Sequence, residues 1–159
     1  MDYNDNDLIN RLLGCAYGQA LGDAYGLSTE FEKRKTVANY KLTAHSSRWE
    51  RGDWTDDTDQ WILILETLVE GNGDERIFAK KLKRWIEYGF PELNDYAGMG
   101  LGANIEQVVF SHGYLRNPIE TSRMIWEHRN RQVALNEAVM RCSAVTFVHF
   151  DGLQKVTKA

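Results

Sequence analysis

The chain has 159 residues, of which 43% are hydrophobic and 11% aromatic, and its 23 acidic and 19 basic side chains give a net charge of −4. This length and composition fit one folded domain and argue against both a two-domain enzyme and a disordered segment. The negative charge is a poor match for a phosphate backbone, so we expect no nucleic-acid partner. No apolar run approaches the roughly 18 residues that a membrane span needs, so we expect no membrane partner either.

The N-terminus and the cysteines point to one compartment. The segment MDYNDNDLIN lacks the basic start and the apolar stretch of a secretory signal peptide. Cys15 and Cys142 have no metal-type spacing and are too few for a disulfide framework, so we expect both to be buried thiols. These features predict a cytoplasmic protein.

Helical periodicity begins near the N-terminus. Residues 7–21 carry apolar side chains at spacings of one, three and four, after Asn and Asp residues that can cap a helix. Glycines at intervals of four then interrupt the pattern, and we expect the helix to end near Gly22. Residues 27–54 lack a sustained period and predict a long connection. A second helix is expected over residues 56–70, because a Gly-Asn-Gly breaker follows it.

A third amphipathic helix is expected after Asp74, which can serve as its cap. The lysine-rich run at residues 80–84 would form its solvated face. Its predicted buried stripe consists of Ile77, Phe78, Leu82, Trp85 and Ile86.

The rest of the chain, from residue 89 onward, mixes loop and helix signals. Residues 89–103 are rich in glycine and predict a loop, and Asn104 is the expected cap of a short helix after it. Further helical patterns cover about residues 119–130 and 136–149. No alternating strand is evident, so the sequence predicts an all-α protein with residues 1–159 as a single domain.

Four carboxylates lie within seven residues at the expected start of the second helix: Asp53, Asp56, Asp57 and Asp59. Such residues can cap a helix and interact favourably with the positive end of its dipole. A cap needs only one of them, and a threonine hydroxyl beside adjacent carboxylates can also hold a hard cation such as Mg²⁺. Both interpretations remain open from the spacing alone.

Two further segments could contact a ligand. Asp23, between Gly22 and Gly26, and the nearby Glu30 could act as acids or bases, although the spacing alone favours a helix end followed by a solvated glutamate. Residues 98–104, Gly-Met-Gly-Leu-Gly-Ala-Asn, could bind a phosphate through backbone N–H groups. No strand precedes this loop, so the dinucleotide-binding fingerprint is not met.

Taken in order, these segments resemble the ADP-ribosylglycohydrolases. Residues 13–24, followed by Glu30, are similar to the opening helix and acidic flap of that family, and residues 52–58 are similar to its Thr-Asp-Asp metal motif. Residues 98–102 resemble a glycine loop that holds the phosphates and ribose of the ligand. Residues 136–141 resemble the family's Asn-Gly-x-x-Met-Arg segment.

The resemblance implies an orthogonal helical bundle in which this chain would be the N-terminal half of a larger domain. It also implies two Mg²⁺ ions, ADP-ribose or an ADP-ribosylated protein as partner, and hydrolysis of the glycosidic bond that joins ADP-ribose to a protein side chain. The metal ligands would be Thr55, Asp56 and Asp57, with Asp59 at most in support of them. The catalytic residues would be Glu30 and Asp57, and the substrate-binding residues would be Gly98, Gly100, Gly102 and Asn136.

The sequence departs from the family pattern in two places. After Arg141 the only acidic residue is Asp151, so the second, Asp-x-Asp-Thr type ligand set has no counterpart, and Glu137 stands where the family usually has glycine. We therefore expect at most part of the two-ion site and weak or absent activity in this chain. A non-catalytic ADP-ribose and Mg²⁺ binding module and a crystallin-like structural protein are the alternatives.

A truncated helical domain would also expose apolar faces that a missing half normally covers. The faces around Trp61 and Leu65, or around Trp85 and Ile86, are the candidates. Exposed patches of this kind predict self-association.

Overall fold

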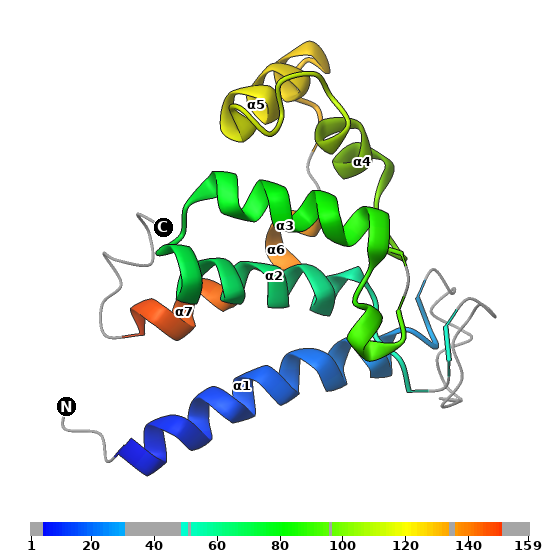
Figure 1. Cartoon of the computed structure of the whole chain (residues 1–159). Coiled ribbons are helices and arrows are strands. Elements are labelled where there is room, and N and C mark those ends of the chain that lie inside the picture. The colour runs from blue at the N-terminus through cyan, green and yellow to red at the C-terminus, as the bar shows by residue number, and fades with distance from the viewer. Residues whose placement is uncertain (1–4, 31–48, 51, 96, 134–135, 151–159) are drawn as a thin grey trace. The chain divides into compact units, whose positions relative to one another are not determined.

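The computed structural model describes residues 5–30, 49–50, 52–95, 97–133 and 136–150, and all regular structure within these ranges is helical (Figure 1). The predicted all-α class is therefore confirmed. The chain divides into two compact units, Met1–Thr58 (the first unit) and Asp59–Ala159 (the second unit). The division falls in the first turn of helix α2 (Asp56–Gly71).

Helix α1 (Asp5–Gly26) lies in the first unit and is continuous over its whole length (Figure 1). The prediction that this helix ends near Gly22 is wrong. The N–H of Leu27 still donates to the carbonyl of Asp23 at 2.9 Å, the spacing of an α-helical bond. Glycine costs about 1 kcal/mol in a helix but keeps its N–H, so the helix runs through it. Most of the connection predicted at residues 27–54 lies outside the described residues.

Helix α2 begins at the predicted Asp56 and ends one residue after the predicted Glu70, and helix α3 (Glu75–Tyr88) begins directly after its predicted cap, Asp74. The Asp74 carboxylate caps α3 by accepting from the N–H of Arg76 at 2.7 Å and from that of Ile77 at 3.4 Å. The turn between the two helices contains Gly73, with a positive φ of 81°. Local capping and turn chemistry therefore set this pair of helices.

The lysine-rich run of α3 is only partly a solvated face. Lys80 and Arg84 are exposed, as predicted. In contrast, the Lys81 ammonium lies 2.8 Å from a Glu66 carboxylate oxygen and 2.9 Å from one of Glu70, both on α2. Burial opposes the charge of Lys81, but hydrogen bonds and attraction to the two glutamates outweigh it and raise its pKa.

The second unit continues with short helices. These are the 3₁₀ helix η1 (Pro91–Leu93), α4 (Ala103–Val109), α5 (Pro118–His128), α6 (Glu137–Met140) and α7 (Ala144–His149). The helical pattern predicted at 136–149 is thus two helices, separated by a turn. Asn104 is not the cap of α4, because Gly102 takes that position and Asn104 lies inside the helix. Its side-chain oxygen instead accepts from Arg129 at the end of α5.

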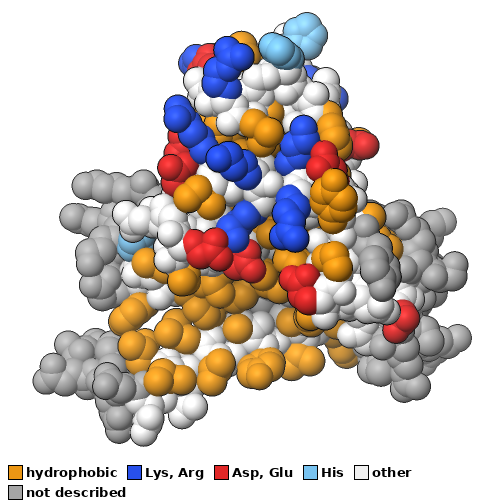
Figure 2. Space-filling view, in the orientation of Figure 1, with side chains coloured by type: hydrophobic (Ala, Val, Ile, Leu, Met, Phe, Trp, Pro, Cys, Tyr) orange, Lys and Arg blue, Asp and Glu red, His pale blue; other side chains and the backbone are white. Residues whose placement is uncertain are grey.

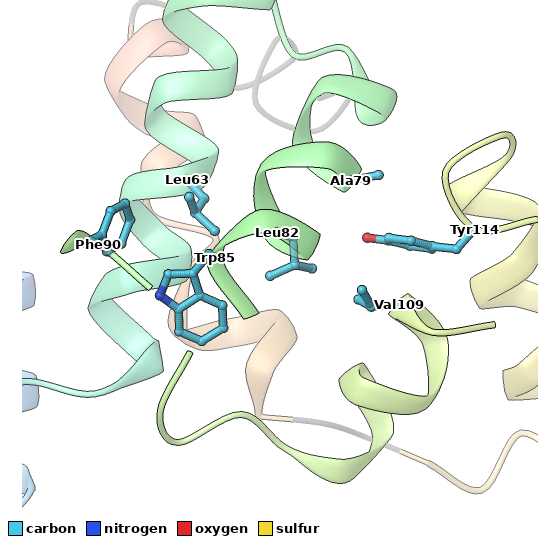
Figure 3. Close-up of a cluster of buried hydrophobic side chains, with 7 residues drawn as sticks. All are labelled: Leu63, Ala79, Leu82, Trp85, Phe90, Val109 and Tyr114. Carbon is cyan, nitrogen blue, oxygen red and sulfur yellow. The ribbon is translucent and has the colours of Figure 1, made fainter. Parts of the chain in front are cut away.

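The core of the second unit joins α2, α3, α4 and the segment before α5 (Figure 3). Trp85 is its largest fully buried side chain, with 1% of its surface exposed. The members of this cluster are Leu63, Ala79, Leu82, Trp85, Phe90, Val109 and Tyr114. Leu82 and Trp85 confirm the stripe predicted for the third helix, and Phe78 and Ile86 pack against the cluster while half-buried.

Both tryptophans expected on open apolar faces are buried, which corrects that expectation. Trp61 is 4% exposed, its indole N–H donates to the Ser143 hydroxyl at 2.9 Å, and its ring meets that of Phe147 edge-on at 5.1 Å. Helix α7 and the residue before it therefore cover the face of α2 around Trp61. Trp85 lies in the central cluster.

The buried-thiol prediction is also wrong, because Cys15 and Cys142 are exposed and neither is in a disulfide.

Lys and Arg side chains gather over α3, α4 and α5 in Figure 2, and several have acidic neighbours, such as Glu120 beside Arg123 at 2.8 Å. Among the described helices, none is both long enough and apolar enough to cross a membrane.

Candidate metal and ligand site

The first unit brings the end of α1 to the residues that begin α2. The half-buried Asp23 carboxylate accepts four hydrogen bonds. One of its oxygens, Oδ2, accepts from the backbone N–H of Thr55 at 3.0 Å, the N–H of Thr58 at 3.0 Å and the Thr58 hydroxyl at 2.7 Å. The other, Oδ1, accepts from the Thr55 hydroxyl at 2.8 Å. Asp23 thus caps α2 from a position 32 residues earlier in the chain.

The Thr55 hydroxyl, a predicted metal ligand, lies between two carboxylates. Its oxygen is 2.8 Å from Asp23 Oδ1 and 3.1 Å from Asp57 Oδ2, and it accepts from the Asp57 N–H at 3.3 Å. A hydroxyl has one hydrogen and two lone pairs. Asp23 is the nearer acceptor for the hydrogen, and the Asp57 N–H takes one lone pair, so one lone pair of Thr55 remains.

The predicted metal ligands are partly brought together. Thr55 and Asp57 are in contact, and Asp56 follows Thr55 directly in a buried position, 7% exposed. Within the described residues, no three His, Cys, Asp or Glu side chains converge into a metal-binding group. The described part of the site is therefore one edge of oxygen donors at the start of α2.

Asp59 has a different role from its neighbours. It is 7% exposed, and its Oδ2 accepts from the indole N–H of Trp85 at 3.0 Å. This contact anchors α2 to the core of the second unit. Glu30, the predicted flap carboxylate, is half-buried in the turn after α1.

The glycine loop (residues 98–102) has packing and backbone reasons for two of its glycines. A Cβ at Gly98 would lie 2.9 Å from the Trp85 ring and from the Ile86 backbone, so only glycine fits. Gly100 has a φ of 88°, which favours glycine. A Cβ at Gly102 would overlap only the carboxylate end of Glu137, a flexible side chain that can move.

The segment at 136–141 therefore meets the glycine loop, because Glu137 reaches Gly102. Asn136, a predicted substrate-binding residue, precedes α6, is exposed and makes no side-chain cap. Arg141 donates to the buried Gln60 of α2 and lies over the Phe78 ring at 5.6 Å, which fixes the segment to the core.

Asp23 is the site residue whose role the sequence did not assign. Its placement depends on a contact across 32 and 35 residues with Thr55 and Thr58. The signal present in the sequence was a carboxylate among glycines just before the Thr-Asp-Asp stretch.

A family model described as ADP-ribosylglycohydrolase matches residues 4–159. The chain belongs to the ADP-ribosylglycohydrolase family. This places the Thr55–Asp57 edge and the glycine loop in a family that the order of the motifs had already indicated.

Three curated relatives match about half of the chain. It is 32% identical over 87 residues to ADP-ribosylarginine hydrolase Tri1 of Serratia proteamaculans, a match that covers 54% of this chain and 24% of the relative. A protein of the same name from Pseudomonas putida is 33% identical over 88 residues, covering 54% and 24%. An uncharacterized protein of Archaeoglobus fulgidus is 38% identical over 81 residues, covering 48% and 26%. The matched part thus spans about a quarter of each relative's length.

Proposed function

We propose that this chain provides one cation-binding edge of an ADP-ribosylglycohydrolase site, with Thr55, Asp56 and Asp57 as ligands of Mg²⁺. The observation that carries the proposal is the contact of the Thr55 hydroxyl with Asp57 at the start of α2, anchored by Asp23. The corresponding reaction is hydrolysis of the bond between ADP-ribose and a protein side chain.

The donor atoms fit a hard cation. Mg²⁺ prefers hydroxyl and carboxylate oxygens and usually keeps several waters. The donors Thr55, Asp56 and Asp57 supply such oxygens, and water molecules would complete the coordination shell. When bound, the ion would orient substrate hydroxyls and lower the pKa of a bound water.

The proposal gives the other predicted residues separate roles. The Glu30 carboxylate would accept a proton or hold the substrate, and Asp57 would orient the attacking water. In the second unit, the glycine loop residues Gly98, Gly100 and Gly102, together with Asn136, would contact ADP-ribose. ADP-ribosylated arginine is the first substrate to test, because two relatives carry the name ADP-ribosylarginine hydrolase.

The test is isothermal titration of the chain with ADP-ribose, with and without Mg²⁺. The variant pair Asp56→Asn and Asp57→Asn keeps the side-chain size while removing both charges. Its matched control is Glu87→Gln with Glu92→Gln, which removes two charges from exposed positions of the second unit. We expect Mg²⁺-dependent binding that the first pair abolishes and the control pair retains.

Turnover separates the enzyme from a binding module. Release of ADP-ribose from an ADP-ribosylated arginine protein would support hydrolysis by this chain. Binding without release would favour the non-catalytic module. A chain that is helical by circular dichroism and binds neither Mg²⁺ nor ADP-ribose would contradict the proposal and favour a structural protein.

A further inference from the structure

The Asp23 carboxylate does more than a helix cap requires. A side-chain cap usually accepts from one or two backbone N–H groups in the first turn. Asp23 accepts from two N–H groups and from two hydroxyls, those of Thr55 and Thr58. Both threonines are buried, with 5% and 2% of their surface exposed, so water does not replace these bonds easily.

The two oxygens of Asp23 divide this work. Oδ2 accepts the three bonds that hold the first turn of α2, from the Thr55 N–H and from the N–H and hydroxyl of Thr58. Oδ1 accepts from the Thr55 hydroxyl alone. One oxygen therefore serves the helix, and the other determines where the Thr55 hydroxyl hydrogen points.

The direction of that hydrogen decides what the Thr55 oxygen can bind. When the hydroxyl donates its hydrogen to Asp23, the Thr55 oxygen presents a lone pair, which can bind a cation. If Asp23 did not accept it, the nearest alternative acceptor would be Asp57 Oδ2 at 3.1 Å. The hydroxyl hydrogen would then lie between two of the proposed cation ligands.

We propose that Asp23 is the positioning residue of the Thr55–Asp57 edge: it orients the Thr55 hydroxyl so that a lone pair faces a divalent cation. This inference rests on the proposed cation site. Asp23 acts through Thr55 and is not itself a ligand.

The substitution Asp23→Asn separates the two oxygens. The amide oxygen of Asn can replace Oδ2 and keep three of the four bonds, while the amide NH₂ replaces Oδ1 and donates to the Thr55 oxygen. The Thr55 hydroxyl must then accept on that side and turn its hydrogen away. We expect this variant to fold and to bind Mg²⁺ about tenfold more weakly or worse, as measured by titration of the full chain with Mg²⁺ alone.

Two controls isolate the orientation of the hydroxyl. Asp53→Asn removes the same charge two residues before Thr55, where the Asp53 side chain accepts from the neighbouring Trp54 N–H at 2.9 Å. Asp74→Asn makes the same change at the cap of α3, where Asn and Asp cap equally well. We expect less than about a threefold change in Mg²⁺ affinity from either control.

A second readout does not depend on the cation. In amide hydrogen exchange, Asp23→Ala should expose the N–H of Thr55, whereas Asp23→Asn should keep it protected. The N–H of Thr58 is a weaker probe, because it also donates to the Thr55 carbonyl at 3.2 Å. Unchanged protection in Asp23→Ala would overturn the inference whatever the Mg²⁺ result.

The outcomes distinguish this inference from the proposed function. If the native chain binds Mg²⁺ and Asp23→Asn binds it equally well, or if Asp53→Asn weakens binding as much as Asp23→Asn, the inference is wrong while the cation site stands. If the native chain binds no Mg²⁺, the proposed site fails and the positioning role fails with it, and the exchange data then leave Asp23 as a helix cap alone.

Discussion

The hydrogen bond from the Trp85 indole to Asp59 should couple α2 and α3 by about 2 kcal/mol. The donor and acceptor atoms are 3.0 Å apart, and the residues are 1% and 7% exposed. A hydrogen bond to a charged group contributes roughly 1.5–3 kcal/mol to stability. A buried carboxylate that loses a donor also keeps its desolvation cost, which places the expected value within that range.

The substitution Trp85→Phe tests this value together with a packing term. Phe lacks the indole N–H and buries roughly 40 Å² less apolar surface, which is about 1 kcal/mol at 25 cal/mol per Å². The total expected loss is therefore about 3 kcal/mol. For a chain of this size, that corresponds to a fall of roughly 6–12 °C in Tm.

A double-mutant cycle isolates the hydrogen bond from the packing term. The variants are Trp85→Phe, Asp59→Ala and the double substitution, and the free energy of unfolding is measured in urea by circular dichroism at 222 nm. Asp59→Ala removes the other contacts of Asp59 whether residue 85 is Trp or Phe, so their energies cancel in the cycle. What remains is the interaction energy between Asp59 and the Trp85 indole. A coupling below about 0.5 kcal/mol would refute the reasoning, since it would mean that the carboxylate gains nothing from the indole.

Three further predictions concern other charges. Burial raises the pKa of Tyr114 to about 12, although the nearby positive charge of Arg141 acts to lower it. The neutral phenol therefore contributes fully to folding stability below the unfolded pKa of about 10, and this contribution is lost as the pH rises towards 12. Over that interval the native chain should lose up to about 3 kcal/mol more unfolding free energy than Tyr114→Phe, and equal losses in the two chains would contradict this. Lys81→Met should cost about 1 kcal/mol in urea unfolding at low salt and less at high salt, whereas Lys80→Met should change stability by under about 0.5 kcal/mol; equal effects would mean that the glutamate contacts of Lys81 contribute nothing. Glu137→Ala should tighten ADP-ribose binding about threefold or more in titration calorimetry, because it removes a negative charge from beside the glycine loop, and an unchanged affinity would place the diphosphate elsewhere.

Features set by local chemistry could be predicted from the sequence. The bounds of α3 follow from Asp74, which accepts from two N–H groups of the first turn, and from Gly89, whose φ of 63° ends the helix. A Cβ at Gly89 would lie 2.7 Å from backbone atoms of residues 95 and 97, so the position requires glycine. Caps and breakers act within a few residues, and therefore the sequence displays them directly.

Features set by distant contacts could not be predicted. Nothing in the periodicity around Thr55 indicates that its hydroxyl hydrogen goes to Asp23, 32 residues earlier. Asn104 is a second example: its local sequence predicts a helix cap, but its side-chain oxygen accepts from Arg129, directly after α5, and Gly102 is the cap of α4 instead. For both Thr55 and Asn104, the local sequence allowed more than one role, and a tertiary contact determined which role the residue has.

The glycine loop and the Thr55–Asp57 edge differ in how strongly they indicate a ligand. Packing against Trp85 requires Gly98, and a positive φ accounts for Gly100, so these two glycines would be kept in a protein that binds nothing. The edge is different, because capping α2 requires only one carboxylate, and Asp23 already supplies it from α1. The cap therefore does not require Asp56 and Asp57, which the proposed cation site would use as ligands.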